Sequence, residues 1–298
     1  LQQYFLLTIA HFIPRPRLFY QLLAFALTFL VYVMVHATRK SISSAASLLK
    51  DPEFAYPTTF FGVMDVVFML AYAIGMVFTG ILGDTYNPIY VMLLAAILTA
   101  LVQCIFGVFV VFLTSSGFHY LYYFMYTCNG VFQSAIWPVL VKIMGNYFGD
   151  MHSGIIFGIW ATNAAVGNIV GANLASLMIV IFGESGRTVI SATFITPAVI
   201  LALVGFFTLV TLPESLEKAL CRITPEQPTT EFIINDDGAK ASGQHEADGN
   251  SQQSDRQRVK FWRAWLIPGV LVFALTYACV KGVNYAMFFW LPLYLHEH

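Results

Sequence analysis

Charged residues are scarce in this chain. Only 15 Lys and Arg and 16 Asp and Glu occur among 298 residues, which makes 10% charged residues, whereas a soluble globular domain has about 25%. Apolar residues make up 58% of the chain. The scarcity of charge excludes a water-exposed surface of ordinary composition. The net charge of −1 gives no electrostatic reason to expect nucleic acid as a partner.

Sequence motifs of enzymes are missing too. There is no His-Glu-x-x-His, no Gly-x-Ser-x-Gly and no Gly-rich phosphate loop that ends in Lys-Ser or Lys-Thr. The four cysteines are scattered, and three lie in apolar runs, which is typical of packing and not of a disulfide or metal site. We therefore expect no enzyme, no cofactor and no metal. An intramembrane hydrolase that uses Asp65 and His36 is an alternative that no motif spacing supports.

Long uncharged runs are what the chain has instead. A membrane-spanning helix needs about 20 predominantly apolar residues. Seven runs are candidates, at approximately residues 18–38, 60–82, 89–113, 118–144, 154–182, 188–212 and 264–295. These runs are continuous, whereas the strands of a membrane barrel alternate apolar and polar residues. The pattern predicts an all-α polytopic membrane protein.

A polar stretch separates the sixth run from the seventh. Within it, the residues from Asn235 to Arg256 are rich in Asp, Gly, Ser and Gln, a composition typical of disorder. Lys and Arg gather before the first run and in this stretch, which predicts that both are cytosolic. We expect four parts: a cytosolic N-terminus (1–17), a six-helix half (18–212), a cytosolic disordered linker (213–263) and the first helix of a second half (264–298). Because the chain starts with Leu1, we expect a truncated two-halved transporter.

Arg39 and Lys40 follow the first uncharged run. A cation at membrane depth is costly, so it usually has a partner or faces a polar cavity. Tyr32, His36 and Arg39 are spaced i, i+4 and i+7, which places them on one face of a helix. Together these side chains can donate several hydrogen bonds to phosphate oxygens, and the Arg fork binds phosphate through two of them. The pattern predicts an anion site. The alternative is that both cations reach the membrane interface and end the span.

Lys281 lies deep in the last run, with uncharged residues for more than ten positions on each side. We predict that it faces a ligand, and the alternative is a buried ion pair with Asp65. Asp65, near the start of the second run, is expected to be the charge partner of Arg39 or Lys40. The alternative for Asp65 is a proton carrier during transport.

Lys142 follows Trp137 and Pro138 in the fourth run, where the proline can kink the helix. Lys142 either belongs to the polar site or extends to the cytosolic interface. In the fifth run, small residues recur at four-residue spacing, in the pairs Gly154/Gly158 and Gly167/Gly171. Such pairs let membrane helices approach closely.

Several motifs resemble a known family. Gly80-Ile-Leu-Gly-Asp84-Thr-Tyr-Asn-Pro88 is similar to the loop motif of the major facilitator superfamily, although the basic residues that usually follow the Asp are absent. Further motifs resemble the organophosphate:phosphate antiporter group and, within it, solute carrier family 37, the sugar phosphate exchangers. They are His36-Ala-Thr-Arg39-Lys40, Asn129-Gly130-x-x-Gln133-x-x-x-Trp137-Pro138, Gly145-Asn-Tyr-Phe-Gly149 and Gly158-Ile-Trp160. The segment from Leu275 to Leu295 resembles one member in particular.

The resemblance implies the major facilitator superfamily fold, with two six-helix halves around one central anion site. It implies exchange of an organic phosphate for inorganic phosphate by alternating access, with the phosphate held by one cation from each half. Arg39 matches the cation of the first half and Lys281 that of the second. The positions counted with them as substrate-binding are Tyr32, His36, Trp137 and Lys142. Gly80 and Asp84 are the residues of the conformational loop motif.

The chain also departs from the group. Bacterial glycerol phosphate carriers have a Lys where this chain has Met76 and a His where it has Ala164, so the part of the site that reads the organic group differs. The resemblance implies an endoplasmic reticulum membrane, with a lysosomal membrane as the alternative. The expected partners are an organic phosphate anion, inorganic phosphate and the lipid bilayer. The competing hypothesis is a non-transporting membrane subunit or receptor that keeps the fold and binds a partner subunit.

Overall fold

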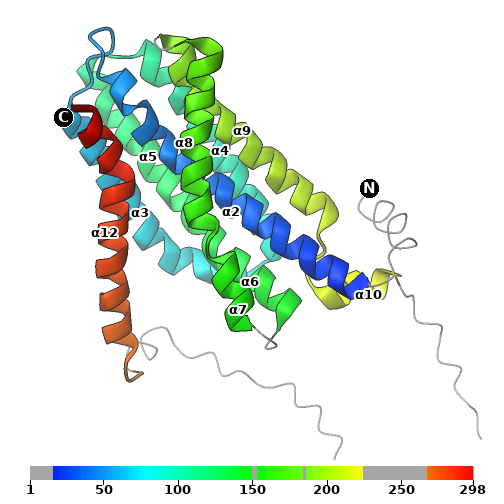
Figure 1. Cartoon of the computed structure of the whole chain (residues 1–298). Helices are drawn as coiled ribbons and strands as arrows, with labels where there is room; N and C mark the ends of the chain where they lie inside the picture. Colours follow the sequence, from blue (N-terminus) through cyan, green and yellow to red (C-terminus); the bar gives the residue numbers. More distant parts are fainter. Residues whose placement is uncertain (1–15, 150–152, 184–185, 224–266, 298) are drawn as a thin grey trace, which may run out of the picture. The chain divides into compact units, whose positions relative to one another are not determined.

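The computed structural model of the chain describes residues 16–149, 153–183, 186–223 and 267–297, and every regular element in these ranges is a helix (Figure 1). This confirms the predicted all-α class. The chain divides into two compact units, one made of Leu1–Pro225 with Phe288–His298 and the other of Glu226–Met287. Most of the expected linker and almost all of the expected N-terminal segment lie outside the described residues.

The helices of the first unit are joined by short connections. They are α2 (Pro16–Leu49), α3 (Thr58–Thr85), α4 (Pro88–Phe112), the single turn η1 (Ser116–Phe118), α5 (His119–Ser134), α6 (Ile136–Phe148), α7 (Ser153–Trp160), α8 (Asn163–Phe182), α9 (Arg187–Thr211) and α10 (Leu216–Ile223). The last helix of the chain is α12 (Val270–Glu297). Local sequence explains the start of α4: the Asn87 side chain accepts a hydrogen bond from the Ile89 amide at 2.9 Å, and Pro88 follows it in the first turn.

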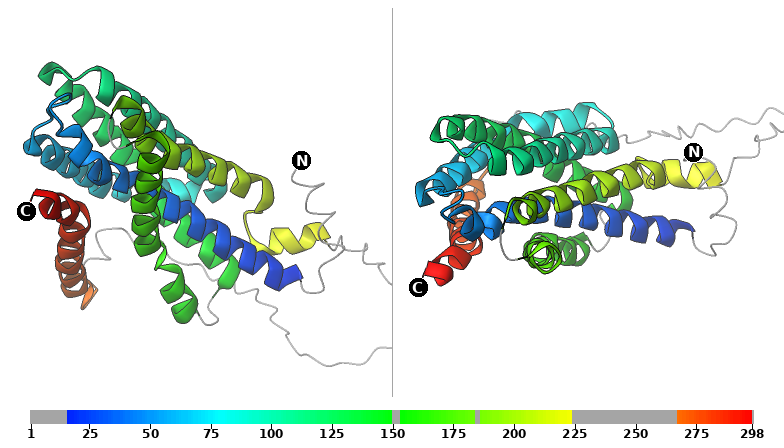
Figure 2. Two further views of the ribbon diagram at one scale, coloured as in Figure 1. Left: turned by 45° about the horizontal axis from the view of Figure 1, so that its top comes forward. Right: turned by 90° about the horizontal axis from the view of Figure 1, so that it is seen from above.

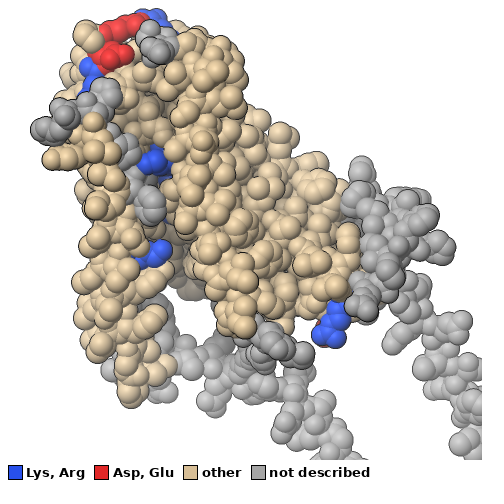
Figure 3. All heavy atoms as spheres, in the orientation of Figure 1, with Lys and Arg blue, Asp and Glu red and all other residues tan. Residues whose placement is uncertain are grey.

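Six described helical segments are long and apolar enough to cross a membrane. They are Pro16–Leu49, Thr58–Gly83, Pro88–Phe112, Gly154–Phe182, Arg187–Thr211 and Val270–Met287. On the face drawn in Figure 3, nearly all described atoms belong to uncharged residues, as expected beside lipid. The run expected at residues 118–144 forms two shorter helices, α5 and α6, which meet at Ala135. Pro138 accounts for the break, because proline is tolerated in the first turn of a helix but not in its interior.

The three most extensive helix–helix contacts are those of α4 with α9, α2 with α8 and α3 with α5 (Figure 2). Helices α2 and α8 approach closely at Gly167, where an added Cβ would lie 2.6 Å from the Val33 carbonyl oxygen. A Cβ added to Gly171 would lie 2.9 Å from the Ala37 Cα, which confirms the close approach expected for this pair of glycines. A Cβ on Gly154 or Gly158 would meet nothing within 4 Å, so that pair packs against none of the described helices.

Two apolar clusters fill the first unit, and polar side chains are buried between them. Along α2, the first cluster takes Tyr20 to Ala37 and the second Ile42 to Leu49, and α4 is divided in the same way. The buried polar side chains that lie between the clusters on α2, α4 and α5 are Thr38, Arg39, Lys40, Ser41, Thr99, Gln103, Asn129, Gln133 and Ser134. We call this set the polar layer. Its members on α2 and α4 lie in the interior of helices that are long enough to span a membrane, and its members on α5 lie in the last two turns of that helix.

Candidate functional site

Arg39 and Lys40 are buried in the middle of a continuous helix. Helix α2 continues past both residues to Leu49, and their exposed fractions are 5% and 6%. A cation that reached the membrane interface would be exposed at the end of its helix. The structure therefore does not support the alternative that these two residues simply end the first span.

The Arg39 guanidinium is held from two sides. Its Nε donates a hydrogen bond to Gln133 Oε1 at 2.7 Å. Its Cζ lies 4.5 Å from the centre of the Tyr72 ring and 5.4 Å from that of Phe68, which is cation–π distance. The hydrogen bond comes from α5 and both rings come from α3. The orientation of the guanidinium is thus set by two other helices.

A chain of amides holds Gln133 in turn. Gln133 Nε2 donates to Asn129 Oδ1 at 3.0 Å, and Asn129 Nδ2 donates to Gln103 Oε1 at 3.0 Å. Gln103 Nε2 then donates to the Thr38 carbonyl oxygen at 3.1 Å, next to Arg39 in the sequence. Each of the three amide side chains is 1% exposed. The network closes a ring from α2 through α5 and α4 back to α2, which holds the Arg39 side chain in place.

A small cavity of about 10 Å³ lies beside this network, roughly the room for one water molecule. Its lining residues come from four helices and are Thr38, Arg39, Ile42, Asp65, Phe68, Met69, Gln103, Tyr126, Asn129 and Gln133. The cavity therefore brings the Arg39 cation and the Asp65 carboxylate to one place. In the described part of the chain, no group of three His, Cys, Asp or Glu residues could hold a metal ion.

Lys40 lies on the same turn of α2 and contacts Ser43, with Nζ to Oγ at 3.3 Å. Its ammonium is close enough to the Asp65 carboxylate for their charges to interact. Asp65 thus faces a cavity shared with Arg39 and attracts Lys40 as well. The role of Asp65 as the charge partner of Arg39 or Lys40 stays a prediction.

An aromatic cluster joins the part of α2 before the cations to α6 and α7. The Tyr32 ring is 4.9 Å from the His36 ring and 4.7 Å from the Trp137 ring, measured between centres. Trp137 stacks on Trp160 at 5.1 Å, and Trp160 Nε1 donates to Thr28 Oγ1 at 3.0 Å. Three residues that the sequence put forward as substrate-binding, Tyr32, His36 and Trp137, therefore lie together.

Lys142 lies at a different place from the Arg39 network. Its Nζ donates to the Gly83 carbonyl oxygen at 2.7 Å, so it joins α6 to the end of α3. Gly83 belongs to the loop motif, between Gly80 and Asp84, both of which lie in the last turns of α3. The structure therefore places Lys142 beside the loop motif.

Lys281 belongs to the second unit of the chain. On α12, its Nζ lies 5.4 Å from the centre of the Tyr277 ring and 6.0 Å from that of Tyr285. These residues are spaced i−4 and i+4 from Lys281, so one helix face carries the cation between two aromatic rings. The side chain is half-buried.

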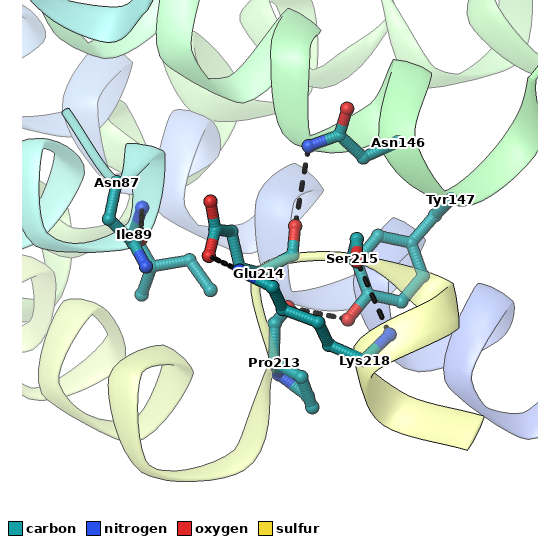
Figure 4. Close-up of polar contacts among 8 residues, drawn as sticks. All are labelled: Asn87, Ile89, Asn146, Tyr147, Pro213, Glu214, Ser215 and Lys218. Atoms are coloured by element: carbon teal, nitrogen blue, oxygen red, sulfur yellow. Dashed lines mark hydrogen bonds and ion pairs between the residues drawn. The ribbon is translucent and has the colours of Figure 1, made fainter. Parts of the chain in front are cut away.

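A larger cavity of about 570 Å³ lies where α10 begins. As Figure 4 shows, Tyr147 Oη donates to the Pro213 carbonyl oxygen at 2.6 Å and Asn146 Nδ2 donates to the Glu214 carbonyl oxygen at 3.3 Å. The Lys218 ammonium forms an ion pair with the Glu214 carboxylate. The cavity is lined by two cations, Arg17 and Lys218, and by two carboxylates, Glu214 and Glu217, so it has no excess of positive charge and suits an anion less well than the polar layer does.

Sequence reasoning did not single out Gln103 or Tyr72 as parts of the site. A signal for Gln103 existed, since it is the only Asn or Gln between Asn87 and Asn129 in an otherwise apolar stretch. A buried amide in a membrane helix needs a partner, which marks it as a network residue. Tyr72 had no such signal, because aromatic residues are common throughout the chain.

Comparison with known proteins finds one matching family and several related transporters. A family model described as Major Facilitator Superfamily matches residues 28–298. Sugar phosphate exchanger 3 from Xenopus laevis is 33% identical over 94% of this chain and 61% of its own length, and the Homo sapiens protein of that name is 31% identical over the same shares. This is the member that the segment from Leu275 to Leu295 indicated.

Plant proteins match as well. Putative glycerol-3-phosphate transporter 1 from Arabidopsis thaliana is 33% identical over 93% of this chain and 56% of its own length. The chain thus spans about three fifths of the length of the curated relatives it matches, 61% for the exchangers. No solved structure matches the chain.

Proposed function

Because the chain belongs to the major facilitator superfamily, we propose that the protein is a secondary transporter that exchanges an organic phosphate for inorganic phosphate. The observation that carries this proposal is the Arg39 guanidinium, which is 5% exposed and is oriented by Gln133 and two aromatic rings. A buried cation of fixed geometry in a membrane helix marks a ligand or ion pathway. The printed names of the relatives, a sugar phosphate exchanger and a putative glycerol-3-phosphate transporter, favour phosphate esters as that ligand.

Phosphate suits this site chemically. The planar Arg fork pairs with two phosphate oxygens at once, and charge-assisted hydrogen bonds of this kind are about twice as strong as neutral ones. Lys40, on the same turn, adds a second positive charge at short range. In a site of low dielectric, two cations attract a divalent anion far more strongly than they would in water.

The second clamp cation in this proposal is Lys281, which the family pattern assigns to the second half of the transporter. Tyr32 and His36 on α2, with Trp137 on α6, contribute a donor-rich and aromatic wall to the site. Lys142 and the loop residues Gly80 and Asp84 contribute to the change between the two access states. In this role the Lys142 bond to the Gly83 carbonyl ties α6 to α3.

The proposal includes exchange by alternating access. An empty clamp leaves like charges at low dielectric, and an anion that binds on one side removes that penalty. Return of the loaded carrier is therefore favoured over return of the empty carrier. The protein is an integral multi-pass membrane protein, and we propose the endoplasmic reticulum membrane as its location, with the lysosomal membrane as the alternative.

The test is phosphate exchange in proteoliposomes that contain the full-length protein. Uptake of labelled phosphate or sugar phosphate should require phosphate inside the vesicles, and Arg39→Ala and Lys281→Ala should each lower it to a small residual rate. Arg187→Ala is the control, because Arg187 pairs with Glu53 at 3.3 Å and both side chains are about half exposed, at 53% and 52%. Full exchange by Arg39→Ala would contradict the proposed site. Absence of uptake with any phosphate ester would favour a different anion or a partner-binding role.

A further inference from the structure

Asp65 is the only carboxylate at membrane depth in the described helices. Helix α2 contains no Asp or Glu, and neither do α4, α5, α6, α8, α9 or the span of α12 from Val270 to Met287. Within the span Thr58–Gly83, Asp65 is the sole acidic residue. A carboxylate in such a position is costly unless it faces opposite charge. The Asp65 carboxylate lies next to the buried cations Arg39 and Lys40.

The position of Asp65 is set by its helix. Asp65, Phe68 and Tyr72 are spaced i, i+3 and i+7 on α3, so they share one face, and both rings contact the Arg39 guanidinium. Helix α3 is held against α5, because a Cβ added to Gly130 would lie 2.5 Å from the Phe68 carbonyl oxygen. Asp65 is thus presented to the cations by a helix that is closely packed on its neighbour.

The charges of Arg39, Lys40 and Asp65 do not cancel. In its ionised form, Asp65 balances one of the two positive charges of Arg39 and Lys40, which leaves a net charge of +1 in the group. Without Asp65, the empty site would hold two like charges in a medium where their repulsion is strong. The single negative charge of Asp65 offsets part of this repulsion in the empty site. A bound divalent phosphate offsets more of it.

We propose that Asp65 is an internal counter-ion, which takes the place of the substrate's phosphate group beside Arg39 and Lys40 when the carrier is empty. It thereby allows the empty carrier to change its access state slowly, and so sets how strictly uptake is coupled to release. This inference rests on the proposed phosphate exchange. It assigns Asp65 a positioning and charge-balancing role and no contact with the substrate's organic group.

Two fluxes measured on the full-length protein test the inference. Exchange is the entry of labelled phosphate into phosphate-loaded vesicles, and net efflux is the loss of labelled phosphate into phosphate-free medium. Asp65→Asn should keep exchange and lower net efflux at least about tenfold, because the empty site then carries an uncompensated charge. Asp65→Glu should retain both fluxes. Glu53→Gln is the control, since this exposed carboxylate pairs with Arg187 away from the polar layer.

A charge-balanced variant separates this role from a merely structural one. Lys40→Gln combined with Asp65→Asn removes one charge of each sign, so net efflux relative to exchange should recover. The binding of inorganic phosphate by Asp65→Asn should also tighten several-fold, because a competing anion has been removed, whereas structural damage would weaken it. If Asp65→Asn is not produced in folded form, the double variant and Asp65→Glu still carry the flux comparison.

The outcomes are distinct. An unchanged ratio of net efflux to exchange in Asp65→Asn overturns the inference, and so does a double variant whose ratio stays as low as that of a folded single variant. A wild-type protein with strict exchange and no measurable net efflux overturns it as well. Absence of any phosphate exchange by the wild-type protein overturns the proposed function and this inference with it. Exchange with a lowered ratio of net efflux to exchange in Asp65→Asn, restored in the double variant, supports both, and a raised ratio in Asp65→Asn overturns the inference.

Discussion

At the scale of single residues, the site depends on how one guanidinium is oriented. The hydrogen bond from Nε to Gln133 and the Tyr72 ring restrict Arg39 to one plane. Lys keeps the charge but has neither the planar fork nor the stacking surface, so the two residues are not interchangeable here. Charge and geometry can therefore be separated by substitution.

Arg39→Lys should lower phosphate exchange by about a hundredfold, the usual effect of a misplaced functional group. The protein should still reach the membrane, because the positive charge that balances Asp65 is kept. The measurement is the initial rate of exchange, normalised to the amount of reconstituted protein. Arg187→Lys is the matched control and should have the wild-type rate. A wild-type rate for Arg39→Lys would mean that charge alone is recognised.

Gln103→Leu should destabilise the protein by about 1–3 kcal/mol, because it leaves the Asn129 amide and the Thr38 carbonyl without their partner in a buried layer. Thermal unfolding in detergent measures the effect. Asn173→Leu serves as the comparison, since Asn173 is exposed and bonds only to the Ile169 carbonyl of its own helix. Equal melting temperatures for the two variants would contradict the importance of the amide chain.

At the scale of helices, the site depends on how closely two backbones approach. Helix α8 lies against α2 where Gly167 and Gly171 face Val33 and Ala37, on the stretch of α2 that carries His36 and the cations. The Cβ atoms of His36 and Lys40 on α2 also lie directly against these two glycines. The position of the site-bearing helix is thus set by glycines on its neighbour, and side chains there would push α2 away.

Gly167→Ala should destabilise the first unit by about 1–3 kcal/mol and reduce exchange, because the new Cβ would lie 2.6 Å from the backbone oxygen of Val33. Gly158→Ala, on the same expected span, adds the same atom where nothing lies within 4 Å. Melting curves of the two variants in one detergent provide the comparison. A Gly167→Ala protein as stable as Gly158→Ala would show that α2 and α8 can separate at no cost.

At the scale of the whole molecule, the proposed clamp needs a cation from each half. Arg39 lies in one compact unit and Lys281 in the other. A phosphate held by both would couple the two halves, which is what alternating access requires. The proposed clamp can therefore be tested by combining substitutions of Arg39 and Lys281 and measuring their joint effect on exchange.

Arg39→Ala and Lys281→Ala together should reduce exchange no further than the more damaging of the two alone. Residues that act as one unit show such non-additive losses. The residual rates of the single and double variants, measured above the protein-free background, decide the question. Losses that multiply would indicate two independent sites and contradict a shared clamp.

Much of this protein follows from the sequence alone. Continuous apolar runs with few charges determine membrane helices, because no other element satisfies its backbone in lipid except a closed barrel, whose alternation is missing. The spacing of Tyr32, His36 and Arg39 placed them on one face, and the cost of a buried charge marked Arg39, Lys40 and Asp65 as functional candidates. These conclusions depend only on local composition and spacing.

Other features depended on contacts between distant residues. The partners of Arg39 lie on α3 and α5, the bond of Lys142 is to a carbonyl on α3, and the exposed fraction of Lys40 is set by helices far along the chain. Sequence spacing does not distinguish among the possible partners of such a residue, because a side chain that faces the interior can contact any of several helices. Only packing selects among them, through the close approach that a few glycines allow and the requirement that every buried polar group finds a partner.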